Sequence, residues 1–129
     1  MAAPPCNLFV TDYSNTVIRR VTMAGNVSTF AGTPGIWVAV DNEAHSAHFN
    51  YPDGITINDQ GIIFVSDSNN PTIRKITPDG MVSTFAGSLL ESGNADGHAS
   101  AARFDTSTRI VVGRDGILFV ADSHNYTIH

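Results

Sequence analysis

The segment Ile-Phe-Val-Ser-Asp at residues 63–67 decides the fold, because closely related segments precede and follow it at the same spacing. Residues 8–12 read Leu-Phe-Val-Thr-Asp, and residues 118–122 read Leu-Phe-Val-Ala-Asp. The similarity extends further, since residues 8–32 and 63–87 are identical at 14 of 25 positions without a gap. Each copy is therefore one structural unit that buries its apolar surface against neighbouring copies.

One period is predicted to contain four strands, at residues 54–58, 62–67, 72–77 and 81–86. Asp-Gln-Gly at 59–61 and Pro-Asp-Gly at 78–80 are turn sequences, and no window shows helical periodicity. The second strand is apolar at four consecutive positions, which predicts burial on both of its faces. We therefore predict an all-β fold of β-propeller blades, each with four antiparallel strands. A solenoid is the alternative, although the interval between copies is long for a repeat of one coil.

Composition and charge exclude several classes of function. The chain has 129 residues, of which 42% are apolar, so it contains enough hydrophobic material for a packed core. The net charge of −5 argues against a nucleic-acid partner, because phosphate binding needs a cationic surface. No apolar run approaches the roughly 20 residues that span a bilayer, so membrane insertion is not expected. Cys6 is the single cysteine, so no internal disulfide can form.

The pattern resembles the NHL-repeat family of β-propellers, and residues 52–80 carry that pattern most fully. Its members there are Pro52, Gly54, Gly61, Phe64-Val65-Ser66-Asp67, Asn70, Ile73-Arg74-Lys75-Ile76 and Gly80. The third copy departs from the pattern, since Ser107, Arg109 and His129 replace the proline, glycine and arginine of the second copy. The resemblance implies a propeller, and the departures concern the local geometry of the last blade.

The chain, residues 1–129, is predicted to be part of a propeller rather than a closed one. Residues 8–32 form a partial blade that lacks the first strand, residues 33–87 a linker and a full blade, and residues 88–129 a linker and the first strands of a third blade. Propellers close with about 4–8 blades. Other chains or missing sequence must therefore complete the ring, and we expect a homo-oligomer or contact with other propeller blades.

Several side chains are candidates for binding, and most of them fall in the predicted linkers and turns on one face of the ring. His45 and His48 are weak candidates for a metal site, because imidazole and the nearby carboxylates are zinc ligands. A surface or packing role is the alternative for this pair. The candidates for contact with a ligand on this face of loops are Trp37, His98, His124 and Tyr126.

The aspartates that end the repeated segment, Asp12, Asp67 and Asp122, are interpreted as structural turn residues that accept backbone N–H groups of the following turn. No catalytic residue is assigned, since a catalytic pair needs two unlike environments and these copies share one. Asn26 and Asn125 stand in glycosylation sequons, which matter only in a secreted eukaryotic protein.

These observations favour a non-catalytic scaffold that binds protein or glycan, with no cofactor and with a weak preference for an extracellular setting. The alternative is a piece of a propeller enzyme with a metal-assisted lyase or hydrolase site in the central channel. Some propellers similar to the NHL family carry out such chemistry. Against it, the strands expected to line the channel read Ile-Thr-Ile at 55–57 and Ile-Val-Val at 110–112, which are apolar.

Overall fold

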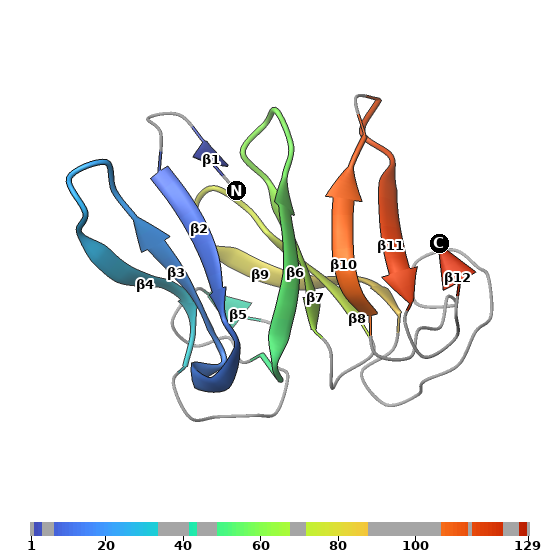
Figure 1. The fold of residues 1–129 in the computed structure, drawn as a ribbon, viewed down its shortest axis with the longest axis horizontal. Coiled ribbons are helices and arrows are strands. Elements are labelled where there is room, and N and C mark those ends of the chain that lie inside the picture. Colours follow the sequence, from blue (N-terminus) through green and yellow to red (C-terminus); the bar gives the residue numbers. More distant parts are fainter. Residues whose placement is uncertain are drawn as a thin grey trace.

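The computed structural model shows three antiparallel sheets that follow one another along the chain and stand side by side (Figure 1). It describes residues 2–3, 7–33, 42–43, 49–67, 72–87, 107–113, 115–122 and 127–128. Within these ranges the helical structure is one 3-10 turn, η1 at Tyr13–Asn15. No helix among the described residues has the length and apolar character needed to span a membrane.

The second sheet contains the complete repeat. Its four long strands are β6 (Pro52–Ile57), β7 (Ile63–Asp67), β8 (Thr72–Ile76) and β9 (Met81–Gly87), and neighbours in sequence pair antiparallel. The repeat pattern predicts these strands to within two residues at either end. A fifth strand, β5 (Asn42–Glu43), pairs with β9 at the outer edge. It arises from the segment that the sequence indicates only as a linker.

The first sheet contains β2 (Asn7–Asp12), β3 (Val17–Val21) and β4 (Val27–Gly32), as the repeat predicts. It also contains a short strand that the sequence does not reveal, β1 (Ala2–Ala3). This strand pairs with β2 in the first sheet as β6 pairs with β7 in the second sheet. The third sheet consists of β10 (Ser107–Val112), β11 (Leu118–Asp122) and β12 (Thr127–Ile128). Each sheet therefore has the strand order of one blade or of part of one.

The turns between strands follow from their sequence. Gly80 has φ of +93° and donates its N–H to the Thr77 carbonyl at 2.9 Å, a left-handed conformation that glycine adopts without a steric penalty. In the same turn the Thr77 hydroxyl donates to Asp79, and this hydrogen bond holds the pKa of the Asp79 carboxyl below its usual range. The turns between β6 and β7 and between β10 and β11 lie together at the top in Figure 1.

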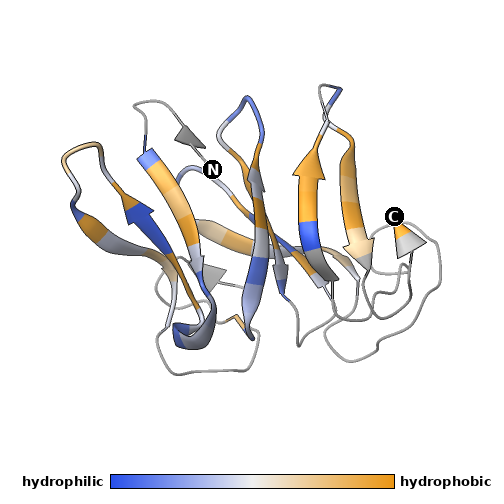
Figure 2. Cartoon of the chain, in the orientation of Figure 1, coloured by the Kyte–Doolittle hydropathy of each residue, from blue (hydrophilic) through white to orange (hydrophobic). Residues whose placement is uncertain are grey.

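The apolar core lies between the sheets, in two separate layers. One layer joins the first and second sheets through residues such as Phe9, Ile63 and Val65, and the other joins the second and third sheets through Phe64, Ile73 and Val120. Successive residues of β7 thus alternate between the two layers, and all five of its residues are buried. This confirms the predicted burial of this strand on both faces and the all-β blade architecture; Figure 2 shows the hydrophobic bands along the strands.

Candidate functional site

The outer face of the first sheet is apolar and exposed, whereas the equivalent face of the second sheet is covered by the first sheet. Val10 is 46% exposed, whereas Val65, its counterpart in the next copy, is fully buried against the first sheet. The same contrast holds for the neighbouring positions: Leu8 and Val27 are exposed, and their counterparts Ile63 and Val82 are buried. The exposed face of the first sheet is therefore equivalent to the face of the second sheet that packs against the first sheet.

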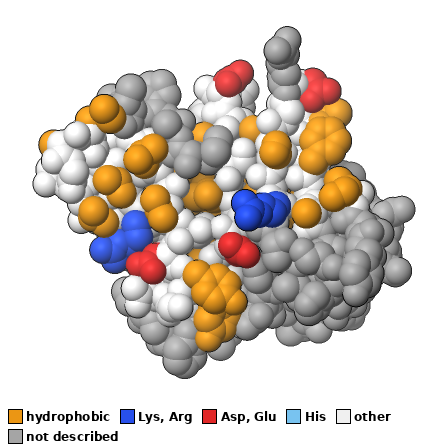
Figure 3. Space-filling model, viewed as in Figure 1, with side chains coloured by type: hydrophobic (Ala, Val, Ile, Leu, Met, Phe, Trp, Pro, Cys, Tyr) orange, Lys and Arg blue, Asp and Glu red, His pale blue; other side chains and the backbone are white. Residues whose placement is uncertain are grey.

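The outer face of the third sheet shows the reciprocal pattern. Phe119 is 51% exposed, whereas its counterpart Phe64 is 7% exposed because it packs against the third sheet. The other exposed apolar residues of this face are Val111, Ile117 and Ile128, which correspond to Thr56, Ile62 and Ile73 in the second sheet. In Figure 3, hydrophobic side chains gather over the first sheet on the left and over the third sheet on the right.

We call these surfaces the first-sheet face (Leu8, Val10 and Val27) and the third-sheet face (Val111, Ile117, Phe119 and Ile128). Exposed apolar side chains that gather on one face make that face a candidate for association with another molecule. The two faces are also complementary, because each corresponds in the repeat to one side of an interface that the chain forms internally.

A buried ion pair fastens the segment before β6 to the second sheet. Arg74 Nη1 lies 3.1 Å from Asp67 Oδ2, and both side chains are fully buried. The other carboxylate oxygen of Asp67 accepts the backbone N–H of Asn50 at 2.6 Å, and the guanidinium of Arg74 lies 5.2 Å from the centre of the Phe49 ring. Asp67 thus has a structural contact, and the amide it binds belongs to the preceding linker segment.

The corresponding residues of the first sheet form different contacts. The Asn15 side chain donates to Asp12 Oδ2 at 2.9 Å, so this carboxylate binds the turn that follows its strand through a side-chain amide. Arg19 Nη1, in the place of Arg74, donates to the Thr29 hydroxyl at 3.4 Å. Both side chains are only half-buried. The backbone of Asp122 pairs in β11, and its side chain lies outside the described part of the structure.

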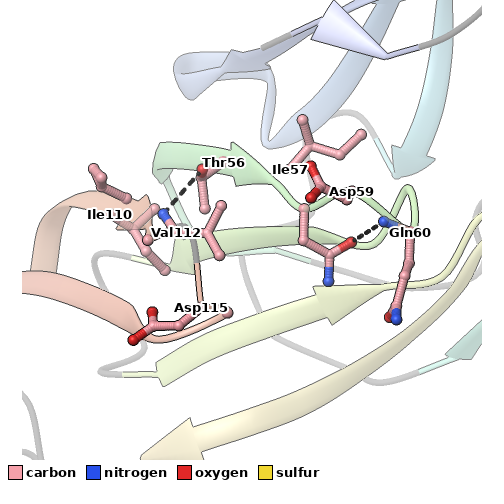
Figure 4. A pocket seen from close by; sticks show the side chains of 11 residues that line it. Thr56, Ile57, Asp59, Gln60, Ile110, Val112 and Asp115 are labelled. Atoms are coloured by element: carbon pink, nitrogen blue, oxygen red, sulfur yellow. Dashed lines mark hydrogen bonds between the residues drawn. The ribbon is translucent and has the colours of Figure 1, made fainter.

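A groove of about 710 Å³ lies between the ends of β6 and β10 and the turns that follow them (Figure 4). The Val112 N–H donates to Thr56 Oγ1 at 3.3 Å and ties the two strands together. The apolar lining includes Ile57, Ile110 and Val112, and the polar rim includes Asn58, Asp59, Gln60 and Asp115. This lining offers apolar contact and hydrogen-bonding groups to a ligand in the groove.

The other residues that the sequence singles out lie outside the described residues, namely His45, His48, Trp37, His98, His124, Tyr126 and Asn125. Asn26 is described and is exposed in the turn before β4, so its sequon is accessible. Among the described residues, no group of three or more histidine, cysteine, aspartate or glutamate side chains is placed to hold a metal ion. The metal prediction for His45 and His48 therefore stays a prediction.

One exposed feature escapes the sequence analysis, an aromatic pair at the other end of the sheets from the groove. Tyr13 in η1 and Tyr51 before β6 have ring centroids 4.8 Å apart at an interplanar angle of 39°. The signal that would have identified them is a break in the repeat, because the equivalent positions hold Ser68 and Ser123 for Tyr13 and Thr106 for Tyr51.

The packed row of blade-like sheets defines a segment of a β-propeller, and comparison with known proteins confirms the resemblance to NHL-repeat propellers. The family model of the Teneurin NHL domain matches residues 38–95. Teneurin-3 of Danio rerio is 25% identical over 142 residues, and Teneurin-3 of Mus musculus is 24% identical. Both alignments cover 95% of this chain and 5% of the relative, so the chain spans a small part of these proteins.

Solved structures show the same fold. A structural genomics protein of unknown function from Bacteroides thetaiotaomicron has a TM-score of 0.90 and 25% identity, over 96% of this chain and 32% of that protein. An auxiliary nutrient binding protein from the same organism has a TM-score of 0.84 and 24% identity, over 95% of this chain and 33% of that protein. A virginiamycin B lyase from Staphylococcus aureus has a TM-score of 0.67 and 20% identity, over 99% and 35%. The chain thus corresponds to about a third of these structures.

Proposed function

We propose that the chain is a non-catalytic propeller module that acts as a structural and protein-interaction scaffold, and that its two outer faces bind further blades of the same kind. In solution a second copy of the chain supplies these blades. The observation that carries the proposal is the exposure of seven apolar side chains at positions equivalent to an interface inside the chain. The length of the similar solved structures, about three times that of this chain, also supports a larger ring.

The copies are expected to join head to tail. Inside the chain, the side of the second sheet that carries Phe64 packs on the third sheet, and the side that carries Val65 packs on the first. Repeating this arrangement brings the third-sheet face of one copy onto the first-sheet face of the next. Because the two faces differ, the contact is heterologous, and it closes into a ring when the rotation between copies allows closure.

The apolar area gives this joint a sizeable driving force. Complete burial of a Val, Leu, Ile or Phe side chain is worth about 1.5–3 kcal/mol. The residues of the two faces are roughly half exposed, so each should contribute about 1 kcal/mol when covered. A charge placed in the centre of either face would lose this gain and would also be desolvated without a partner.

The proposal is tested by measuring mass in solution by light scattering at micromolar concentration. We expect the wild-type chain to assemble, and Val10→Asp to be monomeric because it places a carboxylate in the first-sheet face. Met23→Asp is the matched control, since Met23 is an exposed apolar residue in a turn whose counterpart, Pro78, is exposed as well.

Two results would contradict this proposal. One is a wild-type chain that is folded and monomeric over the whole concentration range. The other is an assembly that Val10→Asp leaves intact, since the first-sheet face would then take no part in it. Circular dichroism on each variant verifies that the sheets are retained.

A further inference from the structure

The first sheet has an incomplete inner strand. In the second sheet, β6 pairs with β7 from one end of β7 to the other. In the first sheet, β1 pairs with β2 at Asn7 and Leu8 only, beside the start of β2 (Figure 1). No strand in the described part of the chain lies along β2 on this side from Val10 to Asp12. We call the side of this stretch that faces away from β3 the open edge of β2.

Backbone hydrogen-bonding groups point out of the open edge. In the second sheet, the Asn58 N–H donates to the Ile62 carbonyl at 3.0 Å, where β6 and β7 begin to pair. Successive residues of an antiparallel strand bond to its two neighbours in turn, so Phe64 and Ser66 face β6. Thr11 is the counterpart of Ser66 in the repeat, so its backbone N–H and C=O face the open edge. A strand edge of this kind is a template for an added strand.

The segment that enters β6 shows which side-chain contacts accompany this pairing. The Phe49 ring is fully buried, and its centre lies 5.2 Å from the guanidinium of Arg74. The next residue, Asn50, donates its backbone N–H to the carboxylate of Asp67 at 2.6 Å. An aromatic ring and the amide after it thus cover the arginine and the aspartate of the repeated motif.

The first sheet retains the residues that would receive such contacts. Arg19 and Asp12, the counterparts of Arg74 and Asp67, are half-buried. Oδ2 of Asp12 accepts the Asn15 side chain, whereas Oδ1 accepts no hydrogen bond from a described residue. In the same part of the structure, no aromatic ring covers the guanidinium of Arg19.

The Thr11 hydroxyl also differs from its counterpart. In the second sheet, the Ser66 hydroxyl accepts the Gly54 N–H at 2.8 Å and so binds the inner strand of its own sheet. The Thr11 hydroxyl instead donates to the Asp53 carbonyl of the neighbouring sheet at 2.7 Å. Its oxygen keeps lone pairs for an N–H donor at the open edge.

We propose that the open edge of β2 binds an extended segment of another polypeptide that carries an aromatic residue five positions before a glycine, the spacing of Phe49 and Gly54. The segment adds the inner strand to the first sheet. Its ring covers Arg19, and the backbone N–H that follows donates to Asp12 Oδ1. Backbone hydrogen bonds supply the affinity, and the contact of the ring with the cation selects the segment.

The probe is a synthetic peptide with the sequence of residues 49–57, acetylated at its N-terminus and carrying fluorescein at its C-terminus. Fluorescence anisotropy measures its binding to the full chain, and we expect saturable binding. A peptide with the change Phe49→Ala should bind about tenfold more weakly, because no ring then covers Arg19.

Hydrogen–deuterium exchange followed by mass spectrometry locates the bound peptide. We expect the peptide to slow exchange in residues 7–12, which contain the open edge. Altered exchange in residues 63–67 alone would instead mean that the peptide replaces β6 in the second sheet.

A variant of the chain tests the contact with the cation. Arg19→Leu should weaken binding of the wild-type peptide severalfold and reduce the difference between the two peptides. Arg20→Leu is the matched control, since Arg20 is the next residue of β3 and its side chain points to the opposite face of the sheet. Its affinity for the peptide should equal that of the wild-type chain, and circular dichroism verifies that both variants fold.

Four results would overturn the proposal. They are no binding of the peptide, equal affinity of the two peptides, protection that falls outside residues 7–12, and unchanged binding by folded Arg19→Leu. Solution mass measured on the same samples separates this proposal from the assembly proposal. A monomeric chain that binds the peptide contradicts only the assembly proposal, and an assembled chain that does not bind it contradicts only this one.

Discussion

At the scale of single residues, identical side chains perform different tasks in different copies of the repeat. The pair Asp67 and Arg74 is fully buried because Phe49 and Asn50 cover it. The equivalent pair Asp12 and Arg19 stays half-buried, and each residue bonds to another partner. The role of a repeated residue is therefore set by the linker segment that packs on it, as well as by its own sequence motif.

This difference predicts unequal costs for the same substitution. Asp67→Asn should destabilise the chain by about 3–5 kcal/mol, because it leaves the buried guanidinium of Arg74 without its carboxylate. Asp12→Asn should cost at most about 1 kcal/mol, since the site is partly solvated. Urea unfolding followed by circular dichroism measures both values. Equal losses in the two variants would refute the structural role assigned to the buried pair.

At the scale of elements, neighbours decide the burial of strands that have nearly the same sequence. All five residues of β7 are buried, whereas β2 and β11 are each covered on one face only. Apolar repetition predicts these strands and their turns well. It cannot predict β1 and β5, because two-residue strands such as Ala2–Ala3 and Asn42–Glu43 have no periodicity, and only tertiary proximity brings them to a sheet edge.

The ends of strands also depend on glycine in a way that can be tested. Gly32 ends β4 with φ of +96°, and an added Cβ would lie 2.8 Å from the Thr16 carbonyl oxygen and 3.0 Å from the Phe49 ring. Gly32→Ala should therefore destabilise the chain by about 3 kcal/mol, from backbone strain together with overpacking.

Gly25→Ala provides the matched comparison. Gly25 has φ of +87° but open space around its Cβ position, so only the backbone strain of about 1–2 kcal/mol is expected. Thermal unfolding of both variants separates the two contributions. If Gly25→Ala cost as much as Gly32→Ala, the close approach of Thr16 and Phe49 would not limit this position.

At the scale of the whole molecule, the sequence predicts the class of fold better than it predicts sites. The constant spacing of the repeated segment and its consecutive apolar positions are sufficient for blade architecture, because they express core packing. The contact of Asp67 with the Asn50 amide, and the approach of Tyr13 to Tyr51, join residues that are distant in the sequence. Such contacts depend on how linkers cross between sheets, which no local pattern specifies.

The last prediction concerns the direction of assembly. Phe119→Asp should block the third-sheet face as Val10→Asp blocks the first-sheet face, so either variant alone should be monomeric. An equimolar mixture should form a heterodimer, because the intact third-sheet face of the Val10→Asp chain can bind the intact first-sheet face of the Phe119→Asp chain. Native mass spectrometry distinguishes the species when one variant carries an isotope label.

Symmetric association would give a different result. If third-sheet faces bound one another, Val10→Asp would still dimerise, and if first-sheet faces did so, Phe119→Asp would. In either case mixing would add no new species. A heterodimer that appears only in the mixture therefore requires the two different faces to meet, as the second and third sheets do inside each chain. Its absence, with both variants folded and monomeric, would rule out head-to-tail contact through these faces.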